Sequence, residues 1–251
     1  MTTIAVPYHL DEHIPDLDVM LRPDQIVTVE LPESAGAWDR LAPLYAAVAE
    51  ATSSAAPGAC PVIVCGDCCT ALGIVAGLQA ARGDVGIVWF DAHGDVQTPE
   101  TTASGYLGGM PLRLLAGYRP ELIAASLGLR PVPEDHILLV GARDLDPPEA
   151  VYLAGSAIKR KDTSPTVAAD LPGVPDVPLY VHVDLDVLDP GEAPGLRFPA
   201  PGGPTAEQLA GSLRAILATG RVAAVGIACS WRAGYTHEAR LGRLLEGALN
   251  G

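Results

Sequence analysis

The stretch that most constrains this chain is WFDAHGD, residues 89–95, because it places three side chains with metal-binding atoms directly after an apolar run. The run Val85 to Val88 predicts a fully buried strand. Side chains alternate between the two faces of an extended chain, so Asp91, His93 and Asp95 are expected to point to the same side. Two carboxylates and an imidazole then converge at the end of a strand.

A second predicted strand ends in the same way. The buried run Leu179 to Val183 leads into DLDVLDP, where Asp184 and Asp186 again have a spacing of two. In an open α/β sheet ligands bind outside the carboxyl ends of the strands, so the two clusters are expected to face each other across one crevice. Either cluster alone is also explained by Asp side chains that cap the following loops. The two together favour a binding site.

The predicted cluster of four Asp and one His carries too much negative charge to be buried without compensation. One or two divalent cations would supply the counter-charge. Oxygen-rich ligands with one imidazole suit Mn²⁺ or Mg²⁺ better than Zn²⁺ or Cu²⁺. The sequence therefore predicts a metal centre between the ends of the two strands.

Four of the five cysteines lie within residues 60–69, and Cys229 stands apart. An odd and clustered set is not a secreted disulfide framework, so reduced thiols are expected. The run VIVCGDCC predicts a strand, a turn at Gly66 and a helix from about Cys69. Within it, the CGDC that ends at Cys68 has two interpretations. It has the form of a thioredoxin-like redox motif, or Cys68 is a further metal ligand beside the Asp and His clusters.

Charge and hydropathy exclude some partners and locations. The formal net charge is −14 and no basic block is present, so nucleic acid is not an expected partner. No uncharged apolar run reaches the roughly 18 residues of a membrane span, so no membrane insertion is expected. The N-terminus lacks the basic and apolar regions of a secretory signal, and the expected location is cytoplasmic.

Strand and helix patterns alternate along the chain. Further strands are predicted at residues 2–7, 26–31, 137–140 and 222–229, and helices at residues 37–52 and 236–249, with another after the capping-box spacing of Thr205 and Gln208. Connections are predicted at the Pro- or Gly-rich segments 97–111, 165–178 and 191–203. No composition break divides the 251 residues. The pattern predicts a single α/β domain over residues 1–251 with a doubly wound parallel sheet.

With these motifs in place, the chain resembles the ureohydrolase family, which includes arginase, agmatinase and formimidoylglutamase. Four family landmarks appear in order: a GGDHS-type turn as CGDCC, DAHxD as Asp91 to Asp95, GxRDxDPxE as Gly141 to Glu149, and DxDxxDP as Asp184 to Pro190. The resemblance spans nearly the whole chain. It implies a three-layer α/β/α fold with a central, mostly parallel doubly wound sheet, and two Mn²⁺ ions in the crevice.

The resemblance also implies which residues bind the metals. Carried over position by position, the ligands are Cys68, Asp91, His93, Asp95, Asp184 and Asp186. In the family a hydroxide that bridges the two ions would attack the guanidinium carbon of a linear amidine, and an amine would leave. Asp95 and Asp91 are the predicted catalytic residues, because Asp95 would accept a proton or hydrogen bond from that hydroxide.

Three positions depart from the family pattern. Cys68 stands where the family usually has a histidine ligand, so one site is expected to bind Mn²⁺ weakly or to hold a softer ion such as Zn²⁺ or iron. Gly108 stands where arginases have a histidine that shuttles protons to the leaving amine. Cys229 stands in place of a glutamate that pairs with the guanidinium, and the loss of that partner makes arginine a doubtful substrate.

The same resemblance assigns substrate contacts. These predicted contacts are Gln97, Ser104, Asp144 and Cys229. Tyr106 and Phe198 are expected to make the pocket more apolar than that of arginase. One branch of the family hydrolyses Nω-hydroxyarginine, and Cys68 together with the SGYLGGM segment resembles that branch. The predicted function is hydrolysis of a C–N bond in a guanidino or amidino compound, for example Nω-hydroxyarginine or arginine, to ornithine plus hydroxyurea or urea.

Two other functions fit the same residues. The changes at Cys68, Gly108 and Cys229 also fit a degenerate family member that binds a ligand or partner without turnover. A thiol redox role for CGDC predicts a low-pKa Cys65 or Cys68 that forms a disulfide. For the hydrolase, the expected partner is a small cationic guanidino or amidino substrate. Since the family often forms trimers or hexamers, a homo-oligomer is also expected.

Overall fold

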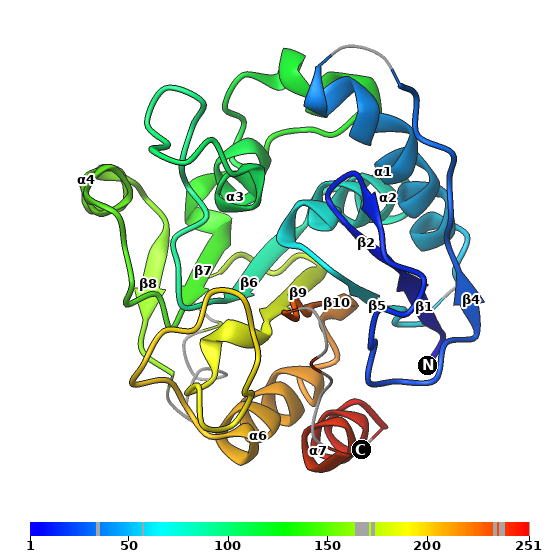
Figure 1. The fold of residues 1–251 in the computed structure, drawn as a ribbon, viewed down its shortest axis with the longest axis vertical. Helices are drawn as coiled ribbons and strands as arrows, with labels where there is room; N and C mark the ends of the chain where they lie inside the picture. The colour runs from blue at the N-terminus through cyan, green and yellow to red at the C-terminus, as the bar shows by residue number, and fades with distance from the viewer. Residues whose placement is uncertain are drawn as a thin grey trace.

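A parallel sheet of eight strands forms the centre of the computed structural model, which describes residues 1–33, 36–56, 58–163, 171, 174–232, 235 and 239–250. The strands are β1 (Thr3–Val6), β4 (Gln25–Ile26), β5 (Val62–Cys65), β6 (Gly86–Phe90), β7 (Ile137–Val140), β8 (Lys159–Lys161), β9 (Leu179–Asp184) and β10 (Val222–Ala228). Their order across the sheet is β4-β1-β5-β10-β9-β6-β7-β8 (Figure 1). A separate antiparallel hairpin joins β2 (Tyr8–His9) to β3 (Glu12–His13).

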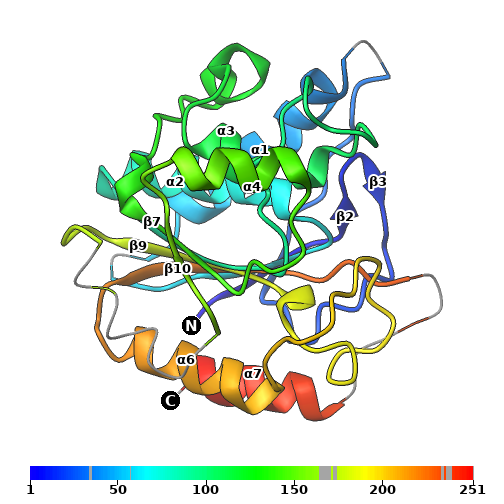
Figure 2. The ribbon, with the colours of Figure 1, turned by 90° about the vertical axis from the view of Figure 1, so that its left-hand side faces the viewer.

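Helices cover both faces of the sheet (Figure 2). On one face lie α1 (Ala37–Ser53), α2 (Ala71–Arg82), α3 (Pro111–Leu115) and α4 (Pro147–Gly155), and on the other lie α6 (Ala206–Leu217) and α7 (Ala239–Asn250). This three-layer α/β/α arrangement confirms the predicted fold class. Within the described ranges, no helix is both long enough and apolar enough to cross a membrane.

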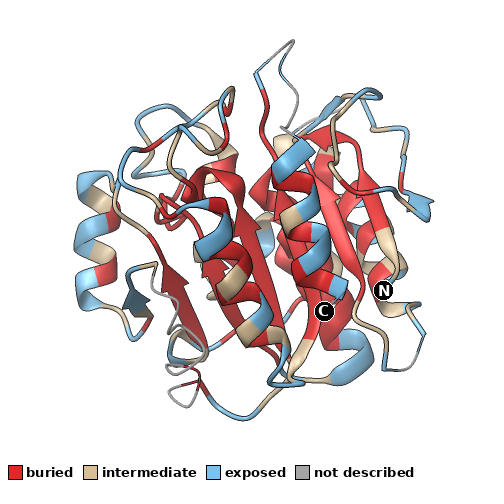
Figure 3. Ribbon diagram, turned by 90° about the horizontal axis from the view of Figure 1, so that it is seen from below, coloured by how far each residue is buried: buried red, intermediate tan, exposed pale blue. Residues whose placement is uncertain are grey.

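The alternation of side chains along each strand sorts the core into two halves. In β6, Ile87 and Trp89 pack in the half under α1 and α2, whereas Val88 and Phe90 pack in the half under α6 and α7. Strands that are covered on both faces need apolar residues at consecutive positions, which is why they appear in the sequence as uninterrupted apolar runs. Figure 3 shows the central strands buried and the helices exposed on their outer sides.

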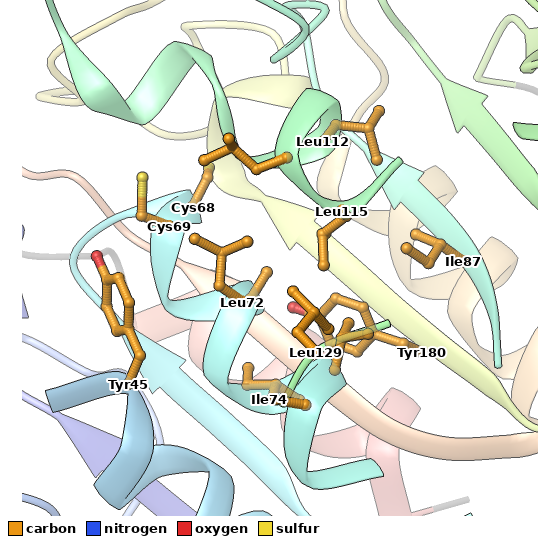
Figure 4. Close-up of a cluster of buried hydrophobic side chains, with 14 of the residues drawn as sticks. Tyr45, Cys68, Cys69, Leu72, Ile74, Ile87, Leu112, Leu115, Leu129 and Tyr180 are labelled. Atoms are coloured by element: carbon orange, nitrogen blue, oxygen red, sulfur yellow. The ribbon is translucent and has the colours of Figure 1, made fainter. Parts of the chain in front are cut away.

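Close packing of α2 against α1 fixes the start of α2 above the strand ends. A Cβ atom at Gly73 or Gly77 would lie 2.5 or 2.4 Å from a carbonyl oxygen of α1, so only glycine permits this approach. Figure 4 shows Leu72 of α2 in the apolar core, with Cys68 and Cys69 at the beginning of the same segment. The helix packing therefore holds Cys68 at the end of the sheet where β5 terminates.

Most predicted elements agree with the structure. The helix at 37–52 is confirmed as α1, the strand at 137–140 as β7, and the capping box at Thr205 begins α6. The edge strand predicted at 26–31 is shorter, because pairing ends at Ile26 and Val29 exchanges hydrogen bonds with the Tyr8 hydroxyl instead. Residues 236–238 of the last predicted helix, and most of segment 165–178, lie outside the described residues.

Candidate metal centre

A cavity of about 340 Å³ opens at the carboxyl ends of the central strands. All six predicted metal ligands line it: Cys68, Asp91, His93, Asp95, Asp184 and Asp186. They come from the segment after β5, the segment after β6 and the end of β9. A cavity of this size at the carboxyl edge of a parallel sheet is typical of small-molecule sites.

The register of β6 against β9 brings the two Asp clusters together. Trp89 of β6 lies beside His182 of β9 in the ladder. Two residues further along each chain, Asp91 and Asp184 therefore emerge on the same face of the sheet. The convergence predicted from the two sequence motifs is a direct result of this pairing.

One part of the centre, which we call the His93 side, consists of Asp91, His93 and Asp186. The Nδ1 atom of His93 lies 3.1 Å from an Asp186 oxygen and 3.4 Å from an Asp91 oxygen. Asp91 also accepts a hydrogen bond of 3.0 Å from the Trp89 indole. Burial acts to lower the pKa of His93, but the hydrogen bonds and charges of the two carboxylates outweigh it and raise the pKa to about 12. The His93 side thus contains a protonated imidazole between two carboxylates.

The other part, the Cys68 side, consists of Cys68, Asp95 and Asp184. The Asp67 side chain caps a short 3-10 helix by accepting a 2.8 Å hydrogen bond from the Cys69 backbone N–H, which orients Cys68. The Cys68 thiol donates to Asp184 Oδ2 at 2.9 Å. Burial, followed by the charges of neighbouring carboxylates, raises the pKa of Cys68, of Asp95 and of Asp184. Each of these three groups therefore holds its proton more tightly than an exposed group of the same kind does.

Asp95 combines two features typical of a functional position. Its φ of 53° lies in the left-handed region, which costs free energy for a residue with a side chain. Its Oδ2 atom is buried and has no hydrogen-bond partner among the residues that the structure describes. An unpaired buried carboxylate oxygen that lines a cavity is a vacant ligand for a cation.

The donor atoms of the centre fit divalent cations. Asp91, His93 and Asp186 offer ligand atoms that all lie within 4.8 Å of one another. Oxygen and imidazole donors of this kind suit Mn²⁺, whereas the thiol of Cys68 favours a softer ion such as Zn²⁺. The residues present are thus compatible with two ions, with different preferences on the His93 side and the Cys68 side.

Two of the predicted substrate contacts line the cavity and one lies at its rim. Gln97 and Ser104 are lining residues, and the Gln97 amide donates to Asp146 at 2.9 Å. The Asp144 side chain is 67% exposed and does not belong to the lining, although its Oδ2 atom is 3.8 Å from His93 Nε2. The amide of Gln97 is therefore better located than Asp144 to contact a bound molecule.

The structure corrects the assignment of Cys229 to the substrate. Cys229 is fully buried on the α6 and α7 side of the sheet, where its thiol donates to the Cys65 carbonyl at 3.0 Å. The next residue, Ser230, lines the cavity instead. Adjacent residues of an extended chain face opposite sides, so a shift of one position exchanges the two.

Tyr106 fills the space beside Gly108. A Cβ atom at Gly108 would lie 2.3 to 2.5 Å from the ring and hydroxyl atoms of Tyr106, so a side chain at position 108 would have to displace the Tyr106 ring. The Tyr106 ring packs against Phe198 with centroids 5.1 Å apart, and its hydroxyl is 3.3 Å from His9 Nε2. Burial raises the pKa of Tyr106, so the hydroxyl keeps its proton inside the cavity.

Several residues near the cavity were not identified from the sequence. Glu149 and Ser230 line it, and His182, which does not line it, has a nitrogen within 4.8 Å of ligand atoms of Cys68 and Asp91. Glu149 accepts hydrogen bonds from the backbone N–H groups of Asp146 and Val96, which ties α4 to the segment after β6. A signal for His182 exists in the sequence, because it precedes Asp184 by two residues and must share its face of the strand.

The thiols of CGDC lack the environment of redox cysteines. Cys65 and Cys68 are both buried, and burial raises the pKa of each thiol. All five cysteines are free thiols. Reactive cysteines need a lowered pKa, so these surroundings disfavour the redox interpretation.

Both the sequence and the fold are similar to those of known proteins. The sequence model of the Arginase family matches residues 3–229. An arginase of Bacillus caldovelox is 32% identical over 164 residues, 59% of this chain and 53% of that protein. The N(omega)-hydroxy-L-arginine amidinohydrolase of Streptomyces lavendulae is 35% identical over 134 residues, 53% of this chain and 47% of that protein. The chain spans about half the length of the curated relatives it matches.

The solved arginase from Bacillus caldovelox has a TM-score of 0.84 at 24% identity, with 100% of this chain and 97% of that chain covered.

Proposed function

The chain belongs to the arginase family, and we propose that it is a metal-dependent hydrolase of a C–N bond in a small guanidino or amidino compound. The observation that carries the proposal is the convergence of the His93 side and the Cys68 side in one cavity. We propose two divalent cations, Mn²⁺ on the His93 side and either Mn²⁺ or a softer ion on the Cys68 side. When bound, such a pair lowers the pKa of water and supplies a nucleophile at neutral pH.

Asp95 is the residue that we assign to proton transfer. Its Oδ2 atom has no hydrogen-bond partner within the described part of the chain, and the residue lines the cavity. Burial raises its pKa, which makes the carboxylate a stronger base than an ordinary aspartate. Asp95 would therefore accept a proton from the attacking water and hold it until the amine leaves.

Nω-hydroxyarginine is the substrate that we propose. The Streptomyces lavendulae relative is named for hydrolysis of this compound. Ser230, which lines the cavity just after β10, offers only a hydroxyl group to a guanidinium. Hydroxylation lowers the pKa of the guanidine, so this substrate depends less on a charged partner than arginine does. The products would be ornithine and hydroxyurea.

The amino-acid head group of this substrate would meet polar groups at the other end of the cavity. Gln97, Ser104 and Asp146 all line it. The hydrogen bond between Gln97 and Asp146 fixes both side chains before a ligand arrives. Fixed polar groups of this kind orient a small ligand in an otherwise apolar pocket.

The leaving amine would take the proton held by Asp95, and we assign Tyr106 to orient that amine by a hydrogen bond. Gly108 has no side chain, and the phenol ring lies against it. The Tyr106 hydroxyl can donate a hydrogen bond towards the cavity while His9 lies 3.3 Å behind it.

The test begins with protein stripped by a chelator and reloaded with Mn²⁺, with Zn²⁺, or with both. Each preparation is incubated with Nω-hydroxyarginine and separately with arginine, and ornithine, hydroxyurea and urea are measured. We expect metal-dependent hydrolysis that is faster for Nω-hydroxyarginine. Asp186→Asn should abolish it, whereas the matched substitution Asp84→Asn, at a side chain 78% exposed, should leave it unchanged.

The second candidate is a family member that binds without turnover. The absence of a side chain at Gly108 and the short hydroxyl of Ser230 favour it. If protein with two bound ions per chain releases neither ornithine nor hydroxyurea, the hydrolase proposal fails. Calorimetric binding of the same two compounds would then identify the ligand of the non-catalytic form.

A further inference from the structure

His182 is a buried polar side chain that the proposed function does not use. Its imidazole is 0% exposed and stacks on the Trp89 ring with centroids 3.7 Å apart. Its Nδ1 atom lies 2.8 Å from the hydroxyl of Tyr180, a residue of the buried core shown in Figure 4. Its Nε2 atom has no hydrogen-bond partner among the described residues. A buried nitrogen without a partner requires an explanation, because leaving it unpaired costs free energy.

The sheet directs this imidazole towards the Cys68 side. His182 and Asp184 are two residues apart on β9, and Trp89 and Asp91 are two residues apart on the neighbouring β6. The imidazole therefore lies on the same face of the sheet as the carboxylates, two residues before Asp184 along β9. The sulfur of Cys68, an oxygen of Asp91 and a nitrogen of His182 all lie within 4.8 Å of one another, and all three residues are buried.

From this geometry we propose that Cys68, Asp91 and His182 hold one divalent cation together, and that this ion is of the thiol-binding kind, such as Zn²⁺. His182 supplies from within the strand the imidazole that position 68 does not provide. The inference rests on the proposed function and deepens it, since it names the ion that Cys68 would bind and adds Asp91 and His182 as its ligands. Its test does not depend on turnover.

The donor set and its surroundings match a zinc site. Zinc binds sulfur at about 2.3 Å and imidazole nitrogen at about 2.0–2.1 Å, which puts tetrahedral ligands roughly 3.5 Å apart. Ligand atoms that already lie within 4.8 Å of one another need only small shifts to reach this arrangement. The Cys68 thiol donates its proton to Asp184 Oδ2. An ion that replaces this proton would therefore lie beside both the Cys68 sulfur and Asp184 Oδ2.

Outer contacts orient two of the three ligands. The Tyr180 hydroxyl contacts Nδ1 of His182 and leaves Nε2 for the ion, and the Trp89 indole donates to Asp91 Oδ2 at 3.0 Å. Metal-binding histidines and carboxylates commonly have such partners, which fix the ligand before the metal arrives. The proposed site therefore needs little rearrangement of side chains.

The His93 side provides an internal reference for the test. Asp91, His93 and Asp186 offer a second set without sulfur, and Asp91 belongs to both. Removal of His93 should leave the sulfur-containing site with its imidazole intact. Removal of His182 should weaken the sulfur-containing site and spare the other.

The first experiment titrates Co²⁺ into the metal-free full chain and records absorption from thiolate-to-cobalt charge transfer. We expect this absorption in the wild type, in His93→Gln and in the matched control His13→Gln, an exposed histidine. His182→Gln should lower the affinity of the absorbing site by more than the roughly 10–100-fold cost of losing an outer contact. Wild-type affinity in His182→Gln, or no charge-transfer absorption with two ions bound, would overturn the proposal.

The second experiment needs no substitution at His182, so it decides the matter even if that variant does not fold. X-ray absorption at the zinc edge is recorded on His93→Gln loaded with one Zn²⁺ per chain. Sulfur at about 2.3 Å together with imidazole scattering supports the site. Sulfur without imidazole overturns it. A protein with this zinc signature that hydrolyses nothing would refute the proposed function and leave the inference intact.

Discussion

On the His93 side of the cavity two carboxylates face a cation, whereas on the Cys68 side the carboxylates face a neutral thiol. His93 lies 3.1 Å from Asp186, and its pKa is raised to about 12. On the Cys68 side burial raises the pKa of Asp95 and of Asp184, and Asp95 Oδ2 is unpaired within the described residues. Charge pairing thus stabilises the His93 side, whereas the buried groups of the Cys68 side have raised pKa values and no cation among them.

This difference determines what each side must lose when a metal binds. An ion on the His93 side displaces the proton of an imidazole that is already well paired. An ion on the Cys68 side relieves the burial and the carboxylate repulsion that raise the pKa values there, and it gives Asp95 Oδ2 a partner. The Cys68 side therefore gains more from a cation, and its sulfur decides which cation that is.

The largest effect is expected where the two sides share a residue. Asp91 belongs to the ligand set of both, so Asp91→Asn should remove both ions and reduce hydrolysis to background. Elemental analysis of metal per chain checks this expectation. Retention of even one tightly bound ion would mean that the sides do not share Asp91. Asp84→Asn, far out on the surface, is the control.

A smaller effect is expected from making the two sides alike. Cys68→His replaces a soft sulfur by an imidazole, and we expect Mn²⁺ affinity on the Cys68 side to rise roughly tenfold, about 1.4 kcal/mol. Titration with Mn²⁺ followed by electron paramagnetic resonance measures the free ion. The matched control is Cys60→His, outside the cavity lining. Unchanged or weaker Mn²⁺ binding in Cys68→His would contradict the role of the thiol.

The pH dependence of the metal-free protein tests the proton assignments. His93 has a raised pKa, so its contribution to stability is complete below about pH 6.5 and declines as the pH rises towards 12. Asp95 and Asp184 also have raised pKa values, so the folded protein holds their protons more tightly than the unfolded chain does. Their effect on the pH dependence of stability therefore has the same sign as that of His93. The free energy of unfolding in EDTA should therefore fall between pH 6.5 and 8.5, by about 1.4 kcal/mol per pH unit for the His93 proton, and the melting temperature should fall with it.

Added metal should cancel this fall, because a cation takes the place of the protons and binds more tightly as the pH rises. Thermal melts with Mn²⁺ and Zn²⁺ over the same pH range provide the comparison. A metal-free protein that becomes more stable from pH 6.5 to 8.5 would contradict the proton assignments on both sides.

The smallest effect is expected at the rim of the Cys68 side. Tyr106→Phe removes the hydroxyl but keeps the ring that fills the space beside Gly108 and packs on Phe198. We expect kcat to fall about 10²-fold, as for the loss of one hydrogen-bond donor at the reacting groups, with little change in KM. Tyr235→Phe, at a side chain 53% exposed, is the control. An unaltered kcat in Tyr106→Phe would remove Tyr106 from the mechanism.

The six proposed metal ligands all line the cavity, whereas only two of the four proposed substrate contacts do, and the difference has a physical reason. Asp91, Asp184 and Asp186 follow buried strands directly, and the period of two fixes their direction. Ser230 was missed in favour of Cys229 because a single-residue error in the end of β10 exchanges the faces. Which of the two residues faces the cavity is visible only in the pairing of Ala228 with Asp184.

Contacts between segments that lie far apart in the chain could not be predicted from the sequence either. The Tyr106 ring against Gly108 depends on the path of a loop, and the approach of His9 to that ring depends on a hairpin 97 residues away. His182 was interpreted only as part of a buried apolar strand, because its neighbours in the sequence are apolar. Only the ladder between β6 and β9 places it beside Trp89 and below the carboxylates.

The stacking of Trp89 on His182 also gives the protein a built-in optical reporter. The indole is fully buried, contacts the imidazole face to face and donates to Asp91. A paramagnetic ion such as Co²⁺ bound within a few ångströms quenches the emission of the indole. Zn²⁺ changes the electric field at the indole without quenching its emission. The fluorescence of Trp89, measured with Trp38 and Trp231 replaced by Phe, therefore distinguishes which ion occupies the end of the sheet without any added label.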